Sequence, residues 1–516
     1  MSILLPGIGR RRFLIGSAAT ALALSYLGAS RGARAQAPRF TADPFSLGVA
    51  SGCPTADGVI LWTRLAPQPN DGGGMPPAPV ELRWELAEDD RFAAIVQRGT
   101  VRAVAEEAHS ARVEISGLKP HRWYWYRFMA GDATSATGRT RTAAAPGDAT
   151  PLRLAFASCA QYEQGYFAAY RHMADEDIDL AIHLGDYIYE ISWGPHHVRR
   201  HGTGVPTTLP EFRDRYALYK SDPDLQKAHA AFPWLVTWDD HEVADDYAND
   251  RSRNQIDQAF FLRMRAAAYR AYWEHMPLPR AMMPAGPDMK IYGGWRFGAT
   301  ADILVLDDRQ YRSHQACGTI DGVADCAERL APERTMLGAA QEQWMAERLQ
   351  QRNGRWTIVA QQTLMAQANR ARGDTPAYWM DGWDGYPAAR QRLIDSIAGS
   401  GAANPVVIGG DVHSYWVADL KRDFDRPDSP AVATELVGSS ITSQGPNPDH
   451  VARMLQKNPQ LKYAEAQKRG YVTVSLGVDH ADIRLRAIGD VTDKNTGIAD
   501  LARFAVENGK AGAQKA

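Results

Sequence analysis

Four apolar runs of the sequence, each with the character of a buried strand, lead directly into residues that can bind a metal ion. The runs lie at 152–157, 180–184, 235–237 and 406–408. The residues that follow them are Cys159, Asp186, Tyr189, Asp239, Asp240, His241, Asp411 and His413. In an α/β sheet, ligands bind beyond the carboxyl ends of the strands. A solvated loop could explain one such end, but four together predict a metal or catalytic site.

The donor atoms indicate which metals this site would hold. Carboxylates favour hard cations such as Ca²⁺ or Mn²⁺. The thiol of Cys159 and the phenol of Tyr189 together favour Fe³⁺ over Mg²⁺, because sulfur prefers a transition metal. A carboxylate shared by two metals would hold them about 3.5–4 Å apart, which is the two-metal geometry of phosphoryl chemistry.

Residues 152–490 predict the α/β domain that would position these side chains. Apolar strand patterns continue at 303–306, 357–360, 432–437, 471–476 and 482–487. Helical patterns lie between the strands, notably at 165–175, 255–275 and 338–352. Strands that alternate with helices are typical of an α/β fold. Residues 491–516 form a tail in which 497–508 could be a short helix.

Residues 41–145 predict a separate β-sandwich. Strand patterns recur between turns rich in Pro, Gly and Asp, at 46–51, 58–64, 80–87, 110–116 and 122–129. Regular spacing of this kind favours a sandwich. Leu118-Lys119-Pro120, followed by Tyr124, resembles the tyrosine corner of fibronectin type III domains. The segment 142–151, rich in Ala, Pro and Gly, is predicted to link the two domains.

The first 35 residues predict export. Arg10-Arg11-Arg12 precedes a mildly apolar stretch, and Ala33-Arg34-Ala35 fits a cleavage site, as in a twin-arginine signal read by its translocase. A membrane anchor is the alternative, but the stretch is short for a span, and no later stretch approaches 18 apolar residues. We expect a chain without a transmembrane segment, in the periplasm or outside the cell.

Composition and cysteine usage support this prediction. Apolar residues make up 45% and charged residues 23%, as in a folded globular protein. Lys and Arg number 58 against 60 Asp and Glu, a balance that argues against a nucleic-acid-binding surface. In an exported protein, Cys317 and Cys326 predict a local disulfide, and Cys53 an unpaired buried thiol.

Longer strings around the strand ends resemble a known family. They are Ala-Ser-Cys at 157–159, His-Leu-Gly-Asp-Tyr-Ile-Tyr-Glu at 183–190, Trp-Asp-Asp-His-Glu-Val at 238–243, Glu-His-Met-Pro-Leu at 274–278, Leu-Asp-x-Arg at 306–309 and Gly-Gly-Asp-Val-His at 409–413. They resemble the PhoD-like alkaline phosphatase and phosphodiesterase family of the calcineurin-like metallophosphoesterases, over nearly the whole chain after the signal. The resemblance implies a two-sheet metallophosphatase α/β sandwich behind an Ig- or fibronectin-III-like β-sandwich. It also implies Fe³⁺ with one or two Ca²⁺, with Mn²⁺ or Zn²⁺ as alternatives.

The resemblance to purple acid phosphatases, which carry the patterns GDxxY, GNH(D/E) and GHxH, implies roles for the metal ligands. Asp186 would bridge two metals, and Tyr189 matches the iron-binding tyrosine. Cys159 stands where those enzymes have an aspartate, and Asp240 where they have a metal-binding asparagine.

The same resemblance implies the remaining roles. Asp411 and His413 stand at the two histidines of GHxH. His241 matches the histidine beside the phosphate, where it would donate a proton to the leaving oxygen. Gln361 stands where a metal-binding histidine is expected, which leaves the second site short of imidazole and favours an oxygen-loving ion.

Other residues allow two interpretations each. Asp239 and Asp250 are either extra metal ligands or solvated carboxylates. Arg309 follows a strand end and either grips a phosphate or forms a structural salt bridge. The basic run at 196–201 is either a solvated loop or a site of phosphate capture.

The predicted function is an exported, metal-dependent phosphoesterase, in which a metal-bridging hydroxide attacks phosphorus in line. Its substrates would be small phosphate esters, or lipid or teichoic-type phosphodiesters. A phospholipase-D-like phosphodiesterase acting on lipid head groups is the nearest alternative. The alternative from another class is a catalytically inactive surface binding protein, against which the complete donor set argues.

Overall fold

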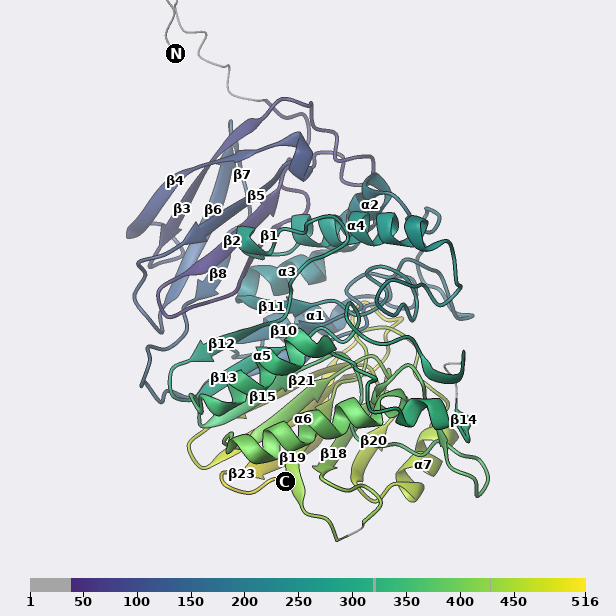
Figure 1. The fold of residues 1–516 in the computed structure, drawn as a ribbon. Helices are drawn as coiled ribbons and strands as arrows, with labels where there is room; N and C mark the ends of the chain where they lie inside the picture. The colour runs from purple at the N-terminus through teal and green to yellow at the C-terminus, as the bar shows by residue number, and fades with distance from the viewer. Residues whose placement is uncertain (1–38, 319–321, 427) are drawn as a thin grey trace, which may run out of the picture.

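The computed structural model describes residues 39–318, 322–426 and 428–516. The predicted export signal, 1–35, therefore lies outside the described residues. Figure 1 shows the N-terminal strands at one end of the molecule, with α4 (Gln258–His275) beside β1 (Val49–Gly52) and β2 (Val59–Arg64), and helices α5 (Gly338–Gln350) and α6 (Pro387–Ser400) toward the other end. Across the described ranges, no helix combines the length and the apolar character needed to cross a membrane.

The larger of two main sheets has ten strands and draws on both ends of the chain. In spatial order they are β24 (Gln514–Lys515), β23 (Ile498–Glu507), β22 (His480–Ile488), β21 (Gly470–Leu476), β9 (Leu152–Ala157), β10 (Leu180–Leu184), β11 (Trp234–Thr237), β1 (Val49–Gly52), β2 (Val59–Arg64) and β5 (Ser110–Ile115). The three central strands, β9, β10 and β11, run parallel. Their carboxyl ends therefore lie at one edge.

The second main sheet has seven strands and carries helices on its outer face. The strands are, in spatial order, β12 (Gly293–Phe297), β13 (Ala301–Val305), β15 (Trp356–Ala360), β17 (Pro405–Gly409), β19 (Ala431–Val437), β18 (Tyr415–Lys421) and β20 (Leu461–Glu465). Helices α5 (Gly338–Gln350) and α6 (Pro387–Ser400) lie across this sheet (Figure 1). A small separate pair is formed by β14 (Val323–Ala324) and β16 (Ala377–Tyr378).

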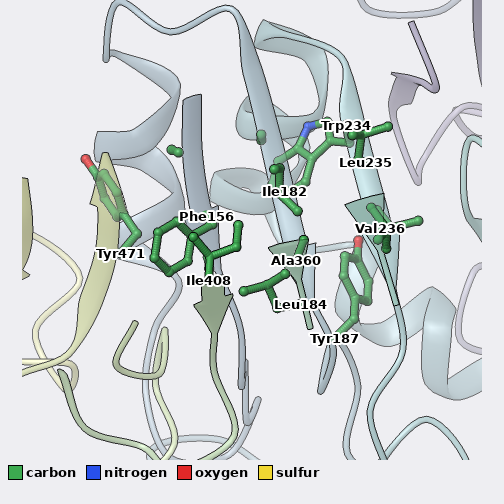
Figure 2. Packing of buried hydrophobic residues seen from close by; sticks show 14 of the residues in the cluster. Phe156, Ile182, Leu184, Tyr187, Trp234, Leu235, Val236, Ala360, Ile408 and Tyr471 are labelled. Carbon is green, nitrogen blue, oxygen red and sulfur yellow. The ribbon is translucent and has the colours of Figure 1, made fainter. Parts of the chain in front are cut away.

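The two main sheets pack face to face, and the core lies between them. Phe156 and Ile182 of the first sheet belong to the same buried cluster as Ala360 and Ile408 of the second, as Figure 2 shows. Val359, which alternates with Ala360, belongs instead to the cluster under α5 and α6. These strands are thus buried on both faces, which explains why they appear in the sequence as unbroken apolar runs.

The N-terminal part forms a second layer of strands. Its five-stranded sheet consists of β4 (Ile95–Ala103), β3 (Val80–Ala87), β6 (Trp123–Ala130), β7 (Ala133–Thr134) and β8 (Gly138–Arg141). All five strands predicted for residues 41–145 are present, as β1, β2, β3, β5 and β6, whereas β4 was not predicted. The tyrosine corner is confirmed, because the Tyr124 hydroxyl accepts a hydrogen bond of 3.0 Å from the Lys119 amide.

The N-terminal strands also continue the main sheet. Strand β1 lies parallel to β11, with Gly52 opposite Trp234. A Cβ atom at Gly52 would lie 2.7 Å from the carbonyl oxygens of Pro277 and Trp234, so only glycine permits this approach. The indole of Trp62 donates to the Glu274 carbonyl at 2.8 Å, which adds a buried polar contact across the junction.

One predicted element is wrong. Residues 497–508 form strand β23 rather than a helix. Ala502, Phe504 and Val506 are buried while Arg503 and Glu507 are exposed, and this period of two pairs the segment with β22. The remaining helices are α1 (Ala168–Ala174), α2 (Leu209–Lys220), α3 (Pro223–Ala231), α4 (Gln258–His275) and α7 (Pro448–Lys457).

Candidate metal centre

The backbone bends sharply where the strands deliver their donor residues. Cys159 follows β9, Asp186 follows β10, and Asp411 and His413 follow β17, with φ values of 60°, 55°, 63° and 51°. Each of these non-glycine residues is in the left-handed region, which costs about 1–3 kcal/mol apiece and is characteristic of functional sites. The fold therefore holds four donor residues in a conformation that their own backbone does not favour.

The donor atoms form overlapping groups. In each group, one donor atom per residue lies within 4.8 Å of the others: Cys159, Asp186 and His413; Asp186, Asp240 and His241; Asp239, Asp240 and Asp411; and Asp240, Asp245 and Asp246. Asp186 belongs to the first two groups, so its carboxylate lies between two sets of donors. This is the arrangement that a bridging ligand requires.

The phenol of Tyr189 completes the first group. Its hydroxyl donates to Asp186 Oδ2 at 2.8 Å and lies 3.2 Å from His413 Nε2. His413 Nδ1 lies 2.9 Å from the Gln444 carbonyl, an acceptor, so this nitrogen carries the proton. The unprotonated Nε2 therefore faces Asp186 and Tyr189, as in a metal-binding histidine.

The buried negative charge of the cluster favours the binding of a cation. One buried oxygen in each of Asp239, Asp240 and Asp411 has no hydrogen-bond partner. Burial and the neighbouring Asp240 raise the pKa of Asp186 well above its usual value, and burial raises the pKa of Asp411 to about 6. A bound cation would offset this desolvated negative charge, so the residues present fit a metal centre.

Glu190 and His241 form a pair beside the second group. His241 Nδ1 lies 2.7 Å from Glu190 Oε2, and the Asp245 amide donates to Glu190 Oε1 at 2.6 Å. Burial opposes the charged imidazole, but Asp240 and Glu190 outweigh it and raise the pKa of His241 well above its usual range. Glu190 was not predicted as a functional residue from the sequence, although it lies four residues after Asp186 in the string at 183–190.

Arg309 is buried among carboxylates. It forms ion pairs with Asp239 and, at 2.7 Å, with Asp381, and its Nη2 lies 3.5 Å from Asp240 Oδ1. Asp381 also pairs with Arg312 at 2.5 Å. Of the two interpretations of Arg309, the salt bridge is the one for which the structure provides partners. Asp381 was missed because no motif marks it.

Two weaker predicted ligands already have protein partners. The Gln361 side-chain oxygen accepts hydrogen bonds from the Thr363 amide at 2.9 Å and from the Trp383 indole at 3.1 Å. Asp250 pairs with His314 at 2.9 Å and belongs to none of the donor groups described above. Asp239, in contrast, lies within the third group.

The basic run and the cysteines have structural surroundings. Arg199 pairs with Asp222 at 2.6 Å and stacks 3.7 Å from the centre of the Tyr162 ring. The predicted disulfide between Cys317 and Cys326 is present, and Cys53 is buried and unpaired as predicted.

A cleft opens beside the donor cluster. Its volume is about 470 Å³, and its lining includes Asp411, His413, Trp193, Arg370 and Trp379. The Trp193 ring stacks on the His413 imidazole, with 5.6 Å between centroids and 6° between planes. A molecule in this cleft would therefore meet aromatic walls and the candidate metal-binding side chains together.

Comparison with known proteins agrees with this geometry. The family model "PhoD-like phosphatase" matches residues 154–485, and that of its N-terminal domain matches residues 31–144. The chain is 45% identical over 492 residues to alkaline phosphatase D of Bacillus subtilis (strain 168), covering 93% of this chain and 83% of the relative. A solved structure titled "Structure of PhoD" superposes with a TM-score of 0.90 at 44% identity, covering 93% of each chain.

A more distant structure shares the fold alone. The purple acid phosphatase PPD1 from yellow lupin (Lupinus luteus) seeds superposes with a TM-score of 0.56 at 10% identity, over 89% of this chain and 73% of the other. Two stacked sheets with donor residues at the strand ends thus place the protein among the metallophosphatase-fold enzymes. Within that class the chain belongs to the PhoD-like phosphatase family, and it is a phosphoesterase of the alkaline phosphatase D type.

Proposed function

We propose that this enzyme hydrolyses phosphate esters at a centre of two or more cations that share Asp186. The observation that carries the proposal is the place of Asp186 in two donor groups at once. Cys159, Tyr189 and His413 would hold Fe³⁺ together with Asp186, because sulfur and phenol donors favour a transition metal. Asp240, which shares the second group with Asp186 and the third with Asp411, would hold one or two Ca²⁺ together with those two carboxylates, because carboxylate oxygens are the usual ligands of this ion.

The bound cations would supply Lewis-acid stabilisation of the phosphoryl oxygens and a water of lowered pKa as nucleophile. Side chains of the protein would provide proton donation, orientation of the proton donor and an additional ligand. His241, although a member of the second group, would donate a proton to the leaving oxygen rather than bind a metal, because, despite burial, Asp240 and Glu190 raise its pKa. Glu190 accepts from His241 Nδ1, which leaves Nε2 3.9 Å from Asp240 Oδ2 and 3.8 Å from Asp245 Oδ1. Asp239 would serve as an additional ligand.

Arg309 would act through the acidic residues. Its charge lies between Asp239 and Asp381 and close to Asp240 and Asp411, so it opposes the rise in carboxylate pKa that burial causes and would hold these side chains in place before a metal binds. A phosphate would reach this guanidinium only by displacing a carboxylate. We therefore assign Arg309 to site assembly rather than to substrate capture.

The cleft supports phosphodiesters as well as monoesters as substrates. A volume of about 470 Å³ leaves room for an ester group beyond the phosphate itself. The relative's name, alkaline phosphatase D, supports monoesters. Lipid or teichoic-type phosphodiesters would be the larger members of the substrate class, with the Trp193 and Trp379 side chains as walls for the leaving group.

The segments that we propose for the chain have the bounds predicted from the sequence. Residues 1–35 would direct export by the twin-arginine translocase to the periplasm or the outside of the cell, 41–145 would be the N-terminal β-sandwich, and 152–490 the catalytic domain. The tail, 491–516, adds β23 and β24 to the main sheet.

Turnover and metal content test the proposal together. Protein purified after native export should hydrolyse p-nitrophenyl phosphate and bis(p-nitrophenyl) phosphate, and elemental analysis should find iron and calcium. A chelator should abolish turnover, and added metal should restore it. Activity that survives complete metal removal would refute the proposal, as would purified protein with full activity and neither metal.

A further inference from the structure

Glu242 ties together the ends of two strands that carry proposed metal ligands. The Tyr187 amide donates to Glu242 Oε1 at 2.6 Å. The amides of Asp186 and Asp239 donate to Glu242 Oε2 at 3.1 and 2.8 Å. Both oxygens of this one carboxylate are thus used by backbone groups, and the residue is only 1% exposed.

These bonds form where the sheet no longer holds the two segments together. Strands β10 and β11 pair in parallel as far as Leu184 and Thr237. Beyond that pair, no ladder hydrogen bonds join the residues that follow β10 to those that follow β11. The proposed site nevertheless needs the two segments to lie close together, because both carry candidate ligands. A Cβ atom at Gly185 would lie 2.4 Å from the Asp239 Cβ, so the two segments touch at a glycine. Beyond the end of the ladder, the hydrogen bonds that Glu242 accepts connect the two segments.

The same bonds oppose the strain at Asp186. Its φ of 55° is unfavourable for a residue with a side chain, and Glu242 accepts the hydrogen bond of that residue's own amide. Hydrogen bonds to a carboxylate are roughly twice as strong as those between neutral groups. A carboxylate that holds three amides is therefore suited to fixing a strained turn.

We infer that Glu242 is a positioning residue, which sets the separation between the Asp186 carboxylate and the carboxylates of Asp239 and Asp240. The inference rests on the proposed function, because the separation matters only if these residues hold metals. Glu242 itself faces backbone amides and touches no reacting atom. Glutamine has one oxygen to accept these amides where the carboxylate has two, so its introduction would widen the gap between Asp186 and the carboxylates of Asp239 and Asp240 and weaken the cation bound there.

Glu242→Gln provides the test, and Glu435→Gln the matched control. Glu435 is also a fully buried glutamate, and it accepts amides of Met365 and Ala366 at 2.5 and 2.8 Å. These amides lie beyond Gln361, whose side-chain oxygen is already bonded to the Thr363 amide and the Trp383 indole. We expect Glu242→Gln to lower the affinity for the calcium-type cation by about 10–100-fold, the usual effect of losing an outer partner of a metal site. Glu435→Gln should lower the melting temperature but leave metal affinity unchanged.

The readouts are calcium and iron content, the calcium dependence of turnover and the melting temperature. Added calcium should restore kcat in Glu242→Gln by mass action, which a purely structural defect would not allow. If Glu242→Gln does not fold, Glu242→Asp, which is one methylene shorter, gives the same comparison. Unchanged calcium affinity in the folded variant overturns the inference, as does an equal loss in Glu435→Gln. Wild-type protein without metal would instead overturn the proposed function.

Discussion

Replacing Glu190 with glutamine tests the pair that it forms with His241. The two side chains are 3% and 9% exposed, and their contact is 2.7 Å long. Glutamine keeps the shape but removes the charge that fixes the imidazole. Proton donation by a positioned side chain contributes about 10²–10⁴-fold to a rate. For a substrate with an alkyl leaving group, we therefore expect Glu190→Gln to lower kcat by about 10²-fold or more, which corresponds to roughly 2.7 kcal/mol of barrier.

The dependence on leaving group shows whether a proton is being donated. An alkyl phosphate needs its leaving oxygen protonated, whereas nitrophenolate departs as an anion. We expect His241→Ala and Glu190→Gln to slow a glycerol phosphodiester by about 10²–10⁴-fold and a nitrophenyl ester much less. Steady-state kinetics with both substrates makes the comparison.

A double variant and a control complete the experiment. Because Glu190 would act only through His241, the variant Glu190→Gln with His241→Ala should be no slower than His241→Ala alone. Glu163 is a matched control, since it is a buried carboxylate 3.5 Å from His201 and outside the donor groups. Equal losses for both substrates, or losses that multiply in the double variant, would refute the assignment.

Three further predictions concern the metals and export. Asp186→Ala should abolish turnover and lower metal content at both sites; full metal occupancy in this variant would remove the bridging role. Cys159→Ala should lose iron and the charge-transfer band that a thiolate and the Tyr189 phenolate give, whereas Cys159→Asp should keep some metal with a shifted or weaker band. An alanine variant with its iron and full activity would show that Cys159 is not a ligand. Arg10→Lys with Arg11→Lys should leave a cytoplasmic precursor, measured by fractionation, and normal export would contradict the twin-arginine route.

Much of the site could be predicted because its residues follow buried strands. The apolar runs before Cys159, Asp186, Asp240 and Asp411 mark the strand ends, and parallel strands bring such ends to one rim. The strands of the α/β domain were predicted from the same apolar runs, since strands buried on both faces leave such runs, whereas their arrangement in two sheets was implied by the family resemblance. The role proposed for each residue came from the resemblance of the longer sequence strings to known phosphatases.

The supporting residues could not be predicted, because their partners are distant in sequence. Asp381 reaches Arg309 across 72 positions, and no local pattern marks it. Glu190 and Glu242 stand inside recognised strings, yet their roles depend on which backbone and imidazole groups the fold presents to them. Strand β23 was predicted as a possible helix; three of its ten residues are alanine, which favours helices in isolation. Its pairing with β22 decided otherwise.

The composition of the ten-stranded sheet has a consequence for the order in which the protein can be made. Strand β9, which leads into Cys159, pairs with β21. Phe156 therefore cannot pair with its partner, Val472, until that residue has been synthesised. His413 and Asp411 are also synthesised late. A chain still on the ribosome therefore has an open edge at β9 and an incomplete donor set, and open edges invite pairing between chains. Stable metal binding should accordingly follow completion of synthesis, and truncation before β21 should yield aggregates rather than a smaller enzyme.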